Sequence, residues 1–286
     1  MTDLAQIVLA GVSVGVIYAL VAGGLTLVFG VFDVLNAAHG EYLMLGAFIS
    51  FLLWEAGVHP LLTLPVSAVA MFVLGVGVQT VFVEPVLKRA PVVSFILLFG
   101  LSAVIRSVVL IFAGANDRVI FHYEGSVEIL GAFLSKGRLL VLAISIPVLL
   151  GAHLYLKYSR FGVATKATAE NPDVAEACGI NVKMIRLSTM GVAAAIAGVA
   201  GSLVAFLFPI NAQTGFTFII ISFVVAVVGG LGNFYGSILA GILVGVAQQL
   251  GSFYIASEIS LGLAYAALLL TLLIRPQGIF GNRAVA

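Results

Sequence analysis

This sequence predicts an all-α fold: a polytopic transmembrane helical bundle with about 8–10 spans, broken or re-entrant segments and a short cytoplasmic coupling helix. Composition is the first reason, because 62% of the 286 residues are hydrophobic, 9% are charged, and the mean hydropathy is +1.22. A soluble domain carries roughly 25% charged residues. The second reason is pattern, because the apolar residues form long continuous runs and not the period-two alternation of a membrane β-barrel.

Nine apolar stretches are candidates for membrane helices, since a helix needs about 20 apolar residues to cross the bilayer core. They lie near residues 5–32, 38–54, 60–83, 91–113, 139–157, 187–209, 216–230, 234–251 and 258–274. The stretch 216–230 is short and runs into Gly229, Gly230 and Gly232. A broken or re-entrant segment is predicted there, of the kind tolerated where it is buried in protein or lines a cavity.

The Lys and Arg residues predict the orientation. Nine of the 13 lie in segments 84–90, 157–186 and 275–286, and three lie in segment 114–138. The positive-inside rule puts the first three segments in the cytoplasm. The N-terminus is then outside and the C-terminus cytoplasmic. The start of the chain lacks the positive n-region of a cleaved signal peptide, so residues 1–286 are expected to form a single transmembrane domain.

Several function classes are disfavoured. A net charge of +1 without a basic run argues against a nucleic-acid partner. His59, His122 and His153 look isolated, and no spacing of His, Cys and acidic residues suggests a metal site. No nucleophile with a matching base is visible, so we expect a non-catalytic protein. The chain also lacks a G-x-x-x-x-G-K-[S/T] phosphate loop, so we expect no cofactor on it and any ATP on another subunit.

The cytoplasmic loop 158–186 predicts a short capped helix at 172–178. Asn171 suits the N-cap, Pro172 the first helical position, and Gly179 the left-handed residue after the end. A helix that lies on lipid headgroups usually carries large apolar and basic residues. This helix has two acids, Asp173 and Glu176, beside Val and Ala. That composition favours docking on a cytoplasmic protein over lying on lipid.

Polar residues interrupt the apolar pattern after the first stretch, at Asn36, His39 and Glu41, around Gly40. Two interpretations stay open: a broken helix that lines the substrate path, or a turn at the cytoplasmic interface with its side chains in water. Two interpretations also stay open for Gly229, Gly230 and Gly232: a segment that lines the substrate path, or an ordinary turn. Arg106, inside the stretch 91–113, either snorkels outward or lies near a substrate carboxylate.

Two smaller features carry predictions of their own. In the outer segment 114–138, the alternation of Val119, Phe121 and Tyr123, and later of Val127 and Ile129, suggests a small strand pair. Gln248 and its neighbour Gln249 are expected to form hydrogen bonds between helices.

Four ordered motifs resemble one transporter family. Residues 36–41, Asn-Ala-Ala-His-Gly-Glu, are similar to its N-F-A-H-G-E signature, with Ala37 in place of the usual Phe. The loop from Arg160 into the following span, the Gly-rich segment 228–236 and the ending 275–281 match in the same order. From about residue 7 to 281 the chain resembles the permease subunits of branched-chain amino acid ABC transporters, the LivH type.

This resemblance implies a permease subunit of an importer in the bacterial inner membrane. Its expected partners are two cytoplasmic ATPase subunits that hold ATP and Mg²⁺, a second related permease and an extracytoplasmic solute-binding protein. Its expected substrate is a branched-chain or related amino acid, or a small amide, moved by alternating access. The wider E-A-A motif is only partly present, as Glu176-Ala177-Cys178-Gly179. The expected ATPase-coupling residues are Glu170, Asn171, Pro172, Asp173, Val174, Glu176, Ala177 and Gly179. The alternative is an ion-coupled secondary transporter or channel without an ATPase partner.

Overall fold

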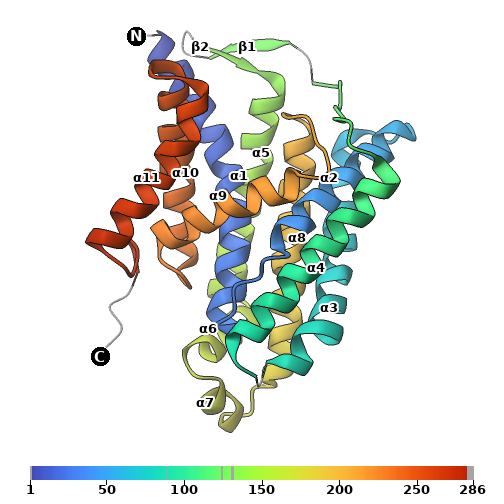
Figure 1. The fold of residues 1–286 in the computed structure, drawn as a ribbon, viewed down its shortest axis with the longest axis vertical. Coiled ribbons are helices and arrows are strands. Elements are labelled where there is room, and N and C mark those ends of the chain that lie inside the picture. Colours follow the sequence, from blue (N-terminus) through green and yellow to red (C-terminus); the bar gives the residue numbers. More distant parts are fainter. Residues whose placement is uncertain (1, 88, 124, 130–131, 282–286) are drawn as a thin grey trace.

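A computed structural model describes residues 2–87, 89–123, 125–129 and 132–281 of the chain (Figure 1). Almost all of its regular structure is helical, which confirms the predicted fold class. The helices, in chain order, are α1 (Thr2–Phe32), α2 (His39–Glu55), α3 (Pro60–Val78), α4 (Pro91–Ala113), α5 (Lys136–Tyr158), α6 (Arg160–Glu170), α7 (Pro172–Ala177), α8 (Val182–Ala205), α9 (Thr214–Gly229), α10 (Phe234–Tyr254) and α11 (Ser257–Ile274).

Each of the nine predicted stretches overlaps one of these helices: α1 to α5 and α8 to α11. Among the described residues, six helices are long and apolar enough to cross a membrane, namely α1, α3, α4, α5, α8 and α10. Thr214–Gly229 in α9 and Ser260–Ile274 in α11 are shorter apolar helices. The predicted short span near 216–230 is thus confirmed as a helix of 16 residues, about 24 Å long.

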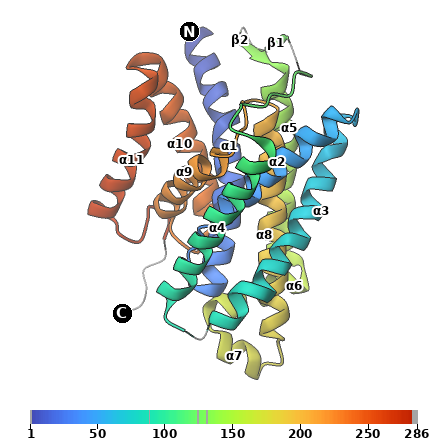
Figure 2. The same cartoon turned by 45° about the vertical axis from the view of Figure 1, so that its right-hand side comes forward.

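Small residues let the central helices approach closely. Gly15 of α1 lies against the backbone of Gly241 and Ile242 of α10. On the other side of the core, Gly201 of α8 lies against the backbone of Leu43 of α2. Contacts of this kind replace the hydrophobic effect as the force that joins helices in lipid. Helices α1 and α8 therefore form the buried centre, whereas α4 crosses the front of the molecule in Figure 2.

The two ends of the bundle differ. One end carries the N-terminus and a hairpin of β1 (Ser126–Ile129) and β2 (Ala132–Ser135), which pair antiparallel with Ser126 opposite Ser135 (Figure 1). The predicted strand at 127–129 is confirmed, but its partner is β2. Residues 119–123 form no strand; Arg118 makes a β-bridge with Ile210.

The opposite end carries α6 and α7 (Figure 1). Helix α6 is absent from the sequence-based prediction, because Gly162, Val163 and two threonines lower the helix propensity of this polar segment. Its start is fixed by Ser159, whose Oγ accepts a hydrogen bond from the Gly162 amide at 2.9 Å. Helix α7 ends at Ala177, one residue before the predicted end. At the same end of the bundle, α3 is followed by a π-helical turn (Gln79–Val83) and then by a 3-10 turn (Glu84–Val86).

Candidate functional site

The chain turns back inside the molecule between α1 and α2. Helix α1 ends at Phe32, and Asp33 adopts a left-handed conformation with φ of 53°. Yet His39, the first residue of α2, packs beside Gly24 of α1. Gly24 precedes the end of α1 by eight residues, or about 12 Å. Helix α2 therefore begins at depth in the bundle and not at its end (Figure 1).

The polar residues of this break are buried. Asn36 is 1% exposed, and His39 and Glu41 are 0% exposed. The interpretation of a turn with its side chains in water is therefore wrong. Asn36 holds the turn itself, because its Oδ1 accepts from the Ala38 amide at 3.0 Å and its Nδ2 donates to Met190 Sδ of α8 at 3.5 Å. The broken-helix interpretation is the one that matches this geometry.

Helix α9 begins beside the start of α2. A side chain at Gly40 would collide with the carbonyl oxygen of Gly215, and one at Gly215 would meet Glu41 Oε2 at 2.6 Å. Two helices thus start against each other in the interior, and glycine at both positions makes the approach possible. Their positive dipole ends meet in the same region.

Glu41 forms the central ion pair of this region. Its Oε1 accepts from Ser102 Oγ at 2.8 Å and from an Arg106 guanidinium nitrogen at 3.3 Å, both from α4. The Arg106 guanidinium also lies over the Phe216 ring of α9, 4.5 Å from its centroid. Arg106 therefore faces the break, where its partner is a carboxylate of the protein itself. Ser102 was missed, although its spacing of four residues from Arg106 places both on one face of a helix.

An apolar cavity of about 280 Å³ opens beside this ion pair. Asn36 and Ser102 are its polar residues. The rest of its lining is apolar and comes from α1, the turn after it, α4 and α9: Leu25, Leu35, Ala37, Phe95, Phe99, Phe216, Ile219, Ile220 and Phe223. The volume is close to the lower end of the range for small-molecule sites. The arrangement suits a compact apolar group with a charged or polar end near Glu41 and Arg106.

The Gly-rich turn after α9 has mixed roles. Gly229 lies against Gly236 of α10, and Gly230 lies against Gln277 and Gly281 of the C-terminal tail, with φ of 97°. The tail is pinned there by a hydrogen bond from the Ile279 amide to the Val228 carbonyl at 2.8 Å. Gly229 and Gly230 therefore serve close backbone packing. Gly232 is exposed and lines a cavity.

The capping predicted for the loop helix is present in α7. Asn171 Oδ1 accepts from the amides of Asp173 and Val174, both at 3.0 Å, and Gly179 has φ of 83°. Ala175 is buried, and Val174 is 58% exposed. Of the other predicted coupling residues, Pro172 is half-buried, and the rest are exposed: Glu170, Asn171, Asp173, Glu176, Ala177 and Gly179. Cys178, directly after α7, is exposed as well.

Buried contacts anchor this exposed segment to the bundle. Thr165 of α6 lies 3.5 Å from Thr189 of α8, oxygen to oxygen. At the start of α8, Arg186 lies 3.9 Å from Glu84, which also accepts a hydrogen bond from Gln79 at 2.9 Å. The Glu84 contacts, which sequence analysis missed, tie α8 to the π-helical turn after α3. A displacement of α7 would thus pass to α3 and α8 together.

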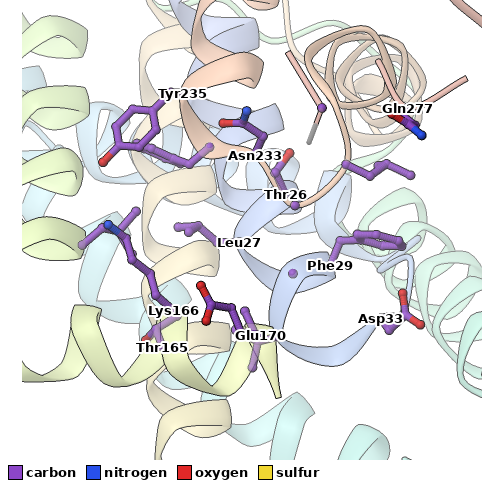
Figure 3. A pocket seen from close by; sticks show the side chains of 18 of the residues that line it. Thr26, Leu27, Phe29, Asp33, Thr165, Lys166, Glu170, Asn233, Tyr235 and Gln277 are labelled. Atoms are coloured by element: carbon purple, nitrogen blue, oxygen red, sulfur yellow. The ribbon is translucent and has the colours of Figure 1, made fainter. Parts of the chain in front are cut away.

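A second, larger cavity of about 900 Å³ lies at the same end (Figure 3). Three distant segments of the sequence line it together with α1. They are α6, through Lys166 and Glu170, the turn with Gly232 and Asn233, and the tail, through Gln277. Three of the four sequence motifs therefore meet at this cavity, and the fourth forms the buried break.

Aromatic contacts correct the prediction that the histidines are isolated. The rings of His59 and His122 lie 5.1 Å apart at the hairpin end, and His153 of α5 lies 5.2 Å from Tyr235 of α10. Tyr123, next to His122, is partly buried, which raises the pKa of its phenol. Within the described residues, no group of three or more His, Cys, Asp or Glu could hold a metal ion. The predicted interhelical hydrogen bond of Gln248 is present, since Tyr18 donates to its Oε1 at 2.8 Å.

Comparisons with known proteins agree with this arrangement. The model of the family described as "branched-chain amino acid transport system / permease component" matches residues 7–273. The high-affinity branched-chain amino acid transport system permease protein LivH of Salmonella typhimurium is 31% identical over 96% of this chain and 94% of its own length.

Two further relatives carry the same kind of name. The permease protein BraD of Pseudomonas aeruginosa is 32% identical over 96% of this chain and 95% of its own length. The permease protein LivM of Escherichia coli is 32% identical over 41% of this chain and 28% of its own length. No solved structure matches the chain.

Proposed function

The chain belongs to the family of permease components of branched-chain amino acid transport systems, and we propose that it forms one half of the translocation path of an ABC importer. The LivH and BraD relatives, matched over nearly their whole length, are named as high-affinity permeases for branched-chain amino acids. The substrate class proposed here is accordingly a branched-chain or related amino acid, or a small amide.

The observation that carries this proposal is the exposed helix α7. Its two ends are capped by its own residues, Asn171 and Gly179, so it keeps its shape without a partner. Its outward side is free and acidic, at the end of the bundle farthest from the hairpin (Figure 1). We assign the following residues to the surface that docks on a cytoplasmic ATPase: Glu170, Asn171, Pro172, Asp173, Val174, Glu176, Ala177 and Gly179. Glu170 stands at the edge of this surface and also lines the large cavity.

This assignment fixes the orientation. The end with α6 and α7 lies in the cytoplasm, so the N-terminus and the hairpin are outside and the C-terminus is inside. The positive-inside rule gives the same orientation from the Lys and Arg residues alone. ATP and Mg²⁺ would bind only to the ATPase partners, and the chain itself would be non-catalytic. A solute-binding protein would dock at the hairpin end.

The translocation path is assigned to the break between α1 and α2. The apolar cavity of about 280 Å³ would receive the side chain of the substrate. The positive charge of Arg106 and the positive dipole ends at the starts of α2 and α9 favour a carboxylate there. Asn36, His39, Gly40 and Glu41 would shape this site, and Gly232 lies where the path reaches the cytoplasm. The partial match to LivM suits a second, related permease on the other side of the path.

Affinity purification from the native membrane tests the function. The tagged full chain is purified in mild detergent, and its companions are identified by mass spectrometry. Recovery of phosphate-loop ATPases in about equal amounts supports the proposal. A stable chain that purifies alone in several detergents would favour the alternative, an ion-coupled secondary transporter or channel.

Reconstitution then tests the substrate class. The purified complex and its binding protein are placed in proteoliposomes, and ATP-dependent uptake of labelled leucine is measured with unlabelled amino acids and amides as competitors. Competition by valine and isoleucine, and none by acidic amino acids, is the expected result. Equal competition by polar amides would assign the path to small amides, the other substrate class proposed.

A further inference from the structure

Two opposite charges without a protein partner line the large cavity at the cytoplasmic end. Lys166 and Glu170 of α6 are both solvent-exposed at this cavity, and in Figure 3 the Lys166 side chain extends toward Tyr235 on the far side. Neither has an ion-pair or hydrogen-bond partner among the residues that the structure describes. One cation and one anion therefore face the same cavity without a protein partner.

The spacing of these two charges is informative. They stand four residues apart on one helix, so they share a face with their Cβ atoms about 5–6 Å apart. Residues at this spacing with opposite charge usually attract each other, yet here they do not pair within 4.0 Å. A ligand with an anionic and a cationic group on the same carbon atom would satisfy both at once. The α-carboxylate and α-ammonium of an amino acid have that relation.

The opposite wall offers polar and apolar groups for the rest of such a ligand. Asn233 and Tyr235, at the start of α10, and Gln277 of the tail are polar. The start of a 21-residue helix also favours the carboxylate. The apolar part of the lining is formed by Leu27, Leu156, Val227, Leu231 and Phe234. The cavity thus combines a zwitterion-matching pair with an apolar surface.

We propose that this cavity is a second amino-acid site, which binds a free zwitterionic amino acid with an apolar side chain from the cytoplasm. A bound amino acid would link α6 to the start of α10. Helix α6 leads directly into α7, so an occupied site would restrain the segment that couples to the ATPase. The regulatory consequence, which rests on the proposed function, is inhibition of uptake by its own accumulated product.

Equilibrium binding tests the site without any transport. The full chain is placed in nanodiscs of phosphatidylcholine, and binding of labelled L-leucine is measured. Saturable binding is expected, weakened about tenfold or more by Lys166→Met, since that variant removes a charge-assisted hydrogen bond. Leucinamide lacks the carboxylate and 4-methylpentanoate lacks the ammonium, so both should compete poorly.

Matched variants separate this site from the translocation path. Lys183→Met removes an exposed cytoplasmic charge that does not line the cavity and should leave binding unchanged. Ser102→Ala alters the cavity at the buried break instead, so it reports any leucine bound in the translocation path. Binding that Ser102→Ala abolishes and Lys166→Met spares would place leucine in the path and overturn the proposal. A correctly folded chain with no saturable binding would overturn it as well.

Lipid is the competing occupant, because the phosphatidylethanolamine headgroup is a zwitterion whose ammonium, unlike the quaternary nitrogen of phosphatidylcholine, can donate hydrogen bonds as an amino acid does. Nanodiscs with half ethanolamine lipid should leave the affinity for leucine within about twofold; loss of leucine binding would assign the cavity to lipid.

In the reconstituted complex, leucine on the ATPase side should slow ATP hydrolysis, and Lys166→Met should relieve this inhibition. If the chain purifies without ATPases but binds leucine as described, only the proposed function fails; if it transports leucine but does not bind it here, only this site fails.

Discussion

The turn at residues 33–38 with the start of α2, and the segment formed by α6 and α7, are both short, polar interruptions of an apolar chain, but they are stabilised in opposite ways. In the first, Glu41 and Asn36 reach partners on α4 and α8, 61 and 154 residues away. In the second, Asn171 Oδ1 caps α7 by accepting hydrogen bonds from the nearby Asp173 and Val174 amides. The first segment is consequently buried and depends on the whole bundle, whereas α7 in the second is capped by its own neighbours in the chain and leaves its surface to a partner.

This contrast teaches that a polar motif in a membrane protein reports function in two ways. A buried motif is expensive unless distant elements satisfy it, so it marks a place where the bundle is built around a site. An exposed, locally capped motif costs the fold little, so its residues are available for binding. Damage to the first should therefore affect folding, and damage to the second should affect only coupling.

The largest expected effect is that of Gly40→Leu. The new side chain would collide with the Gly215 carbonyl and lie 2.7 Å from the Ile219 Cβ, so the obstacle includes backbone. A destabilisation of about 3 kcal/mol or more is expected, at the upper end for overpacking. Size-exclusion profiles and thermal unfolding of a fluorescent fusion measure it. Gly100→Leu is the control, because nothing lies within 4 Å of that position; equal losses in both variants would refute the packing argument.

Removal of one partner of the Glu41 ion pair comes next. Glu41→Gln or Arg106→Gln alone should each cost roughly 3 kcal/mol, because a buried charge is left without its partner. The double variant should cost less than the sum of the two. Unfolding midpoints of the four proteins form a double-mutant cycle. An additive result would show that the two charges do not interact, contrary to their 3.3 Å separation.

Charge reversal in the exposed segment should spare the fold. The double variant Glu170→Lys and Asp173→Lys is expected to reduce ATP-driven uptake by roughly tenfold, equivalent to about 1.4 kcal/mol of lost docking energy. Its abundance and unfolding midpoint should stay unchanged. Glu128→Lys, at the hairpin end, is the control: it should leave co-purification of the ATPases unchanged, whereas the double variant should weaken it. Unchanged uptake in the double variant would remove α7 from the coupling surface.

The smallest effect is expected for Asn171→Ala. This change removes both hydrogen bonds that Asn171 accepts and should destabilise α7 by about 1 kcal/mol. Uptake should fall by at most about fivefold, because α7 can still dock once it refolds on the ATPase. Asn171→Ser retains a capping oxygen and should transport nearly as well as the native chain. If the Ser variant were as impaired as the Ala variant, the amide would contact the ATPase directly.

Local physics explains what the sequence could predict. Continuous apolar runs predicted the bundle, and the residue types at Asn171, Pro172 and Gly179 predicted the capped helix α7, because caps depend on neighbours in the chain. Helix α6 escaped detection because its threonines and Gly162 form a poor helix alone. Its stability comes from packing on α5 and α8, which only the folded chain supplies.

The buried break shows the other limit. The polar residue types at Asn36, His39 and Glu41 indicated a candidate functional site, but they were compatible with both a solvent-exposed turn and a buried site. The decision depended on Ser102 and Gly215, far away in the chain, and on how deep α2 begins. The large cavity is a stronger case, since it joins α6, the Gly-rich turn and the C-terminal tail. No local pattern indicates that these segments meet.

Site-specific cross-linking shows directly whether α7 docks on a cytoplasmic ATPase. In a Cys178→Ser background, Val174→Cys places a thiol on the most outward apolar position of α7, where the native side chain is 58% exposed. Val127→Cys, on β1 and 40% exposed, is the matched control at the other end. Both are labelled with a photo-cross-linking maleimide in native membranes. The account predicts a cross-link from position 174, but not from position 127, to a phosphate-loop ATPase. Full labelling at position 174 without any ATPase adduct would contradict it.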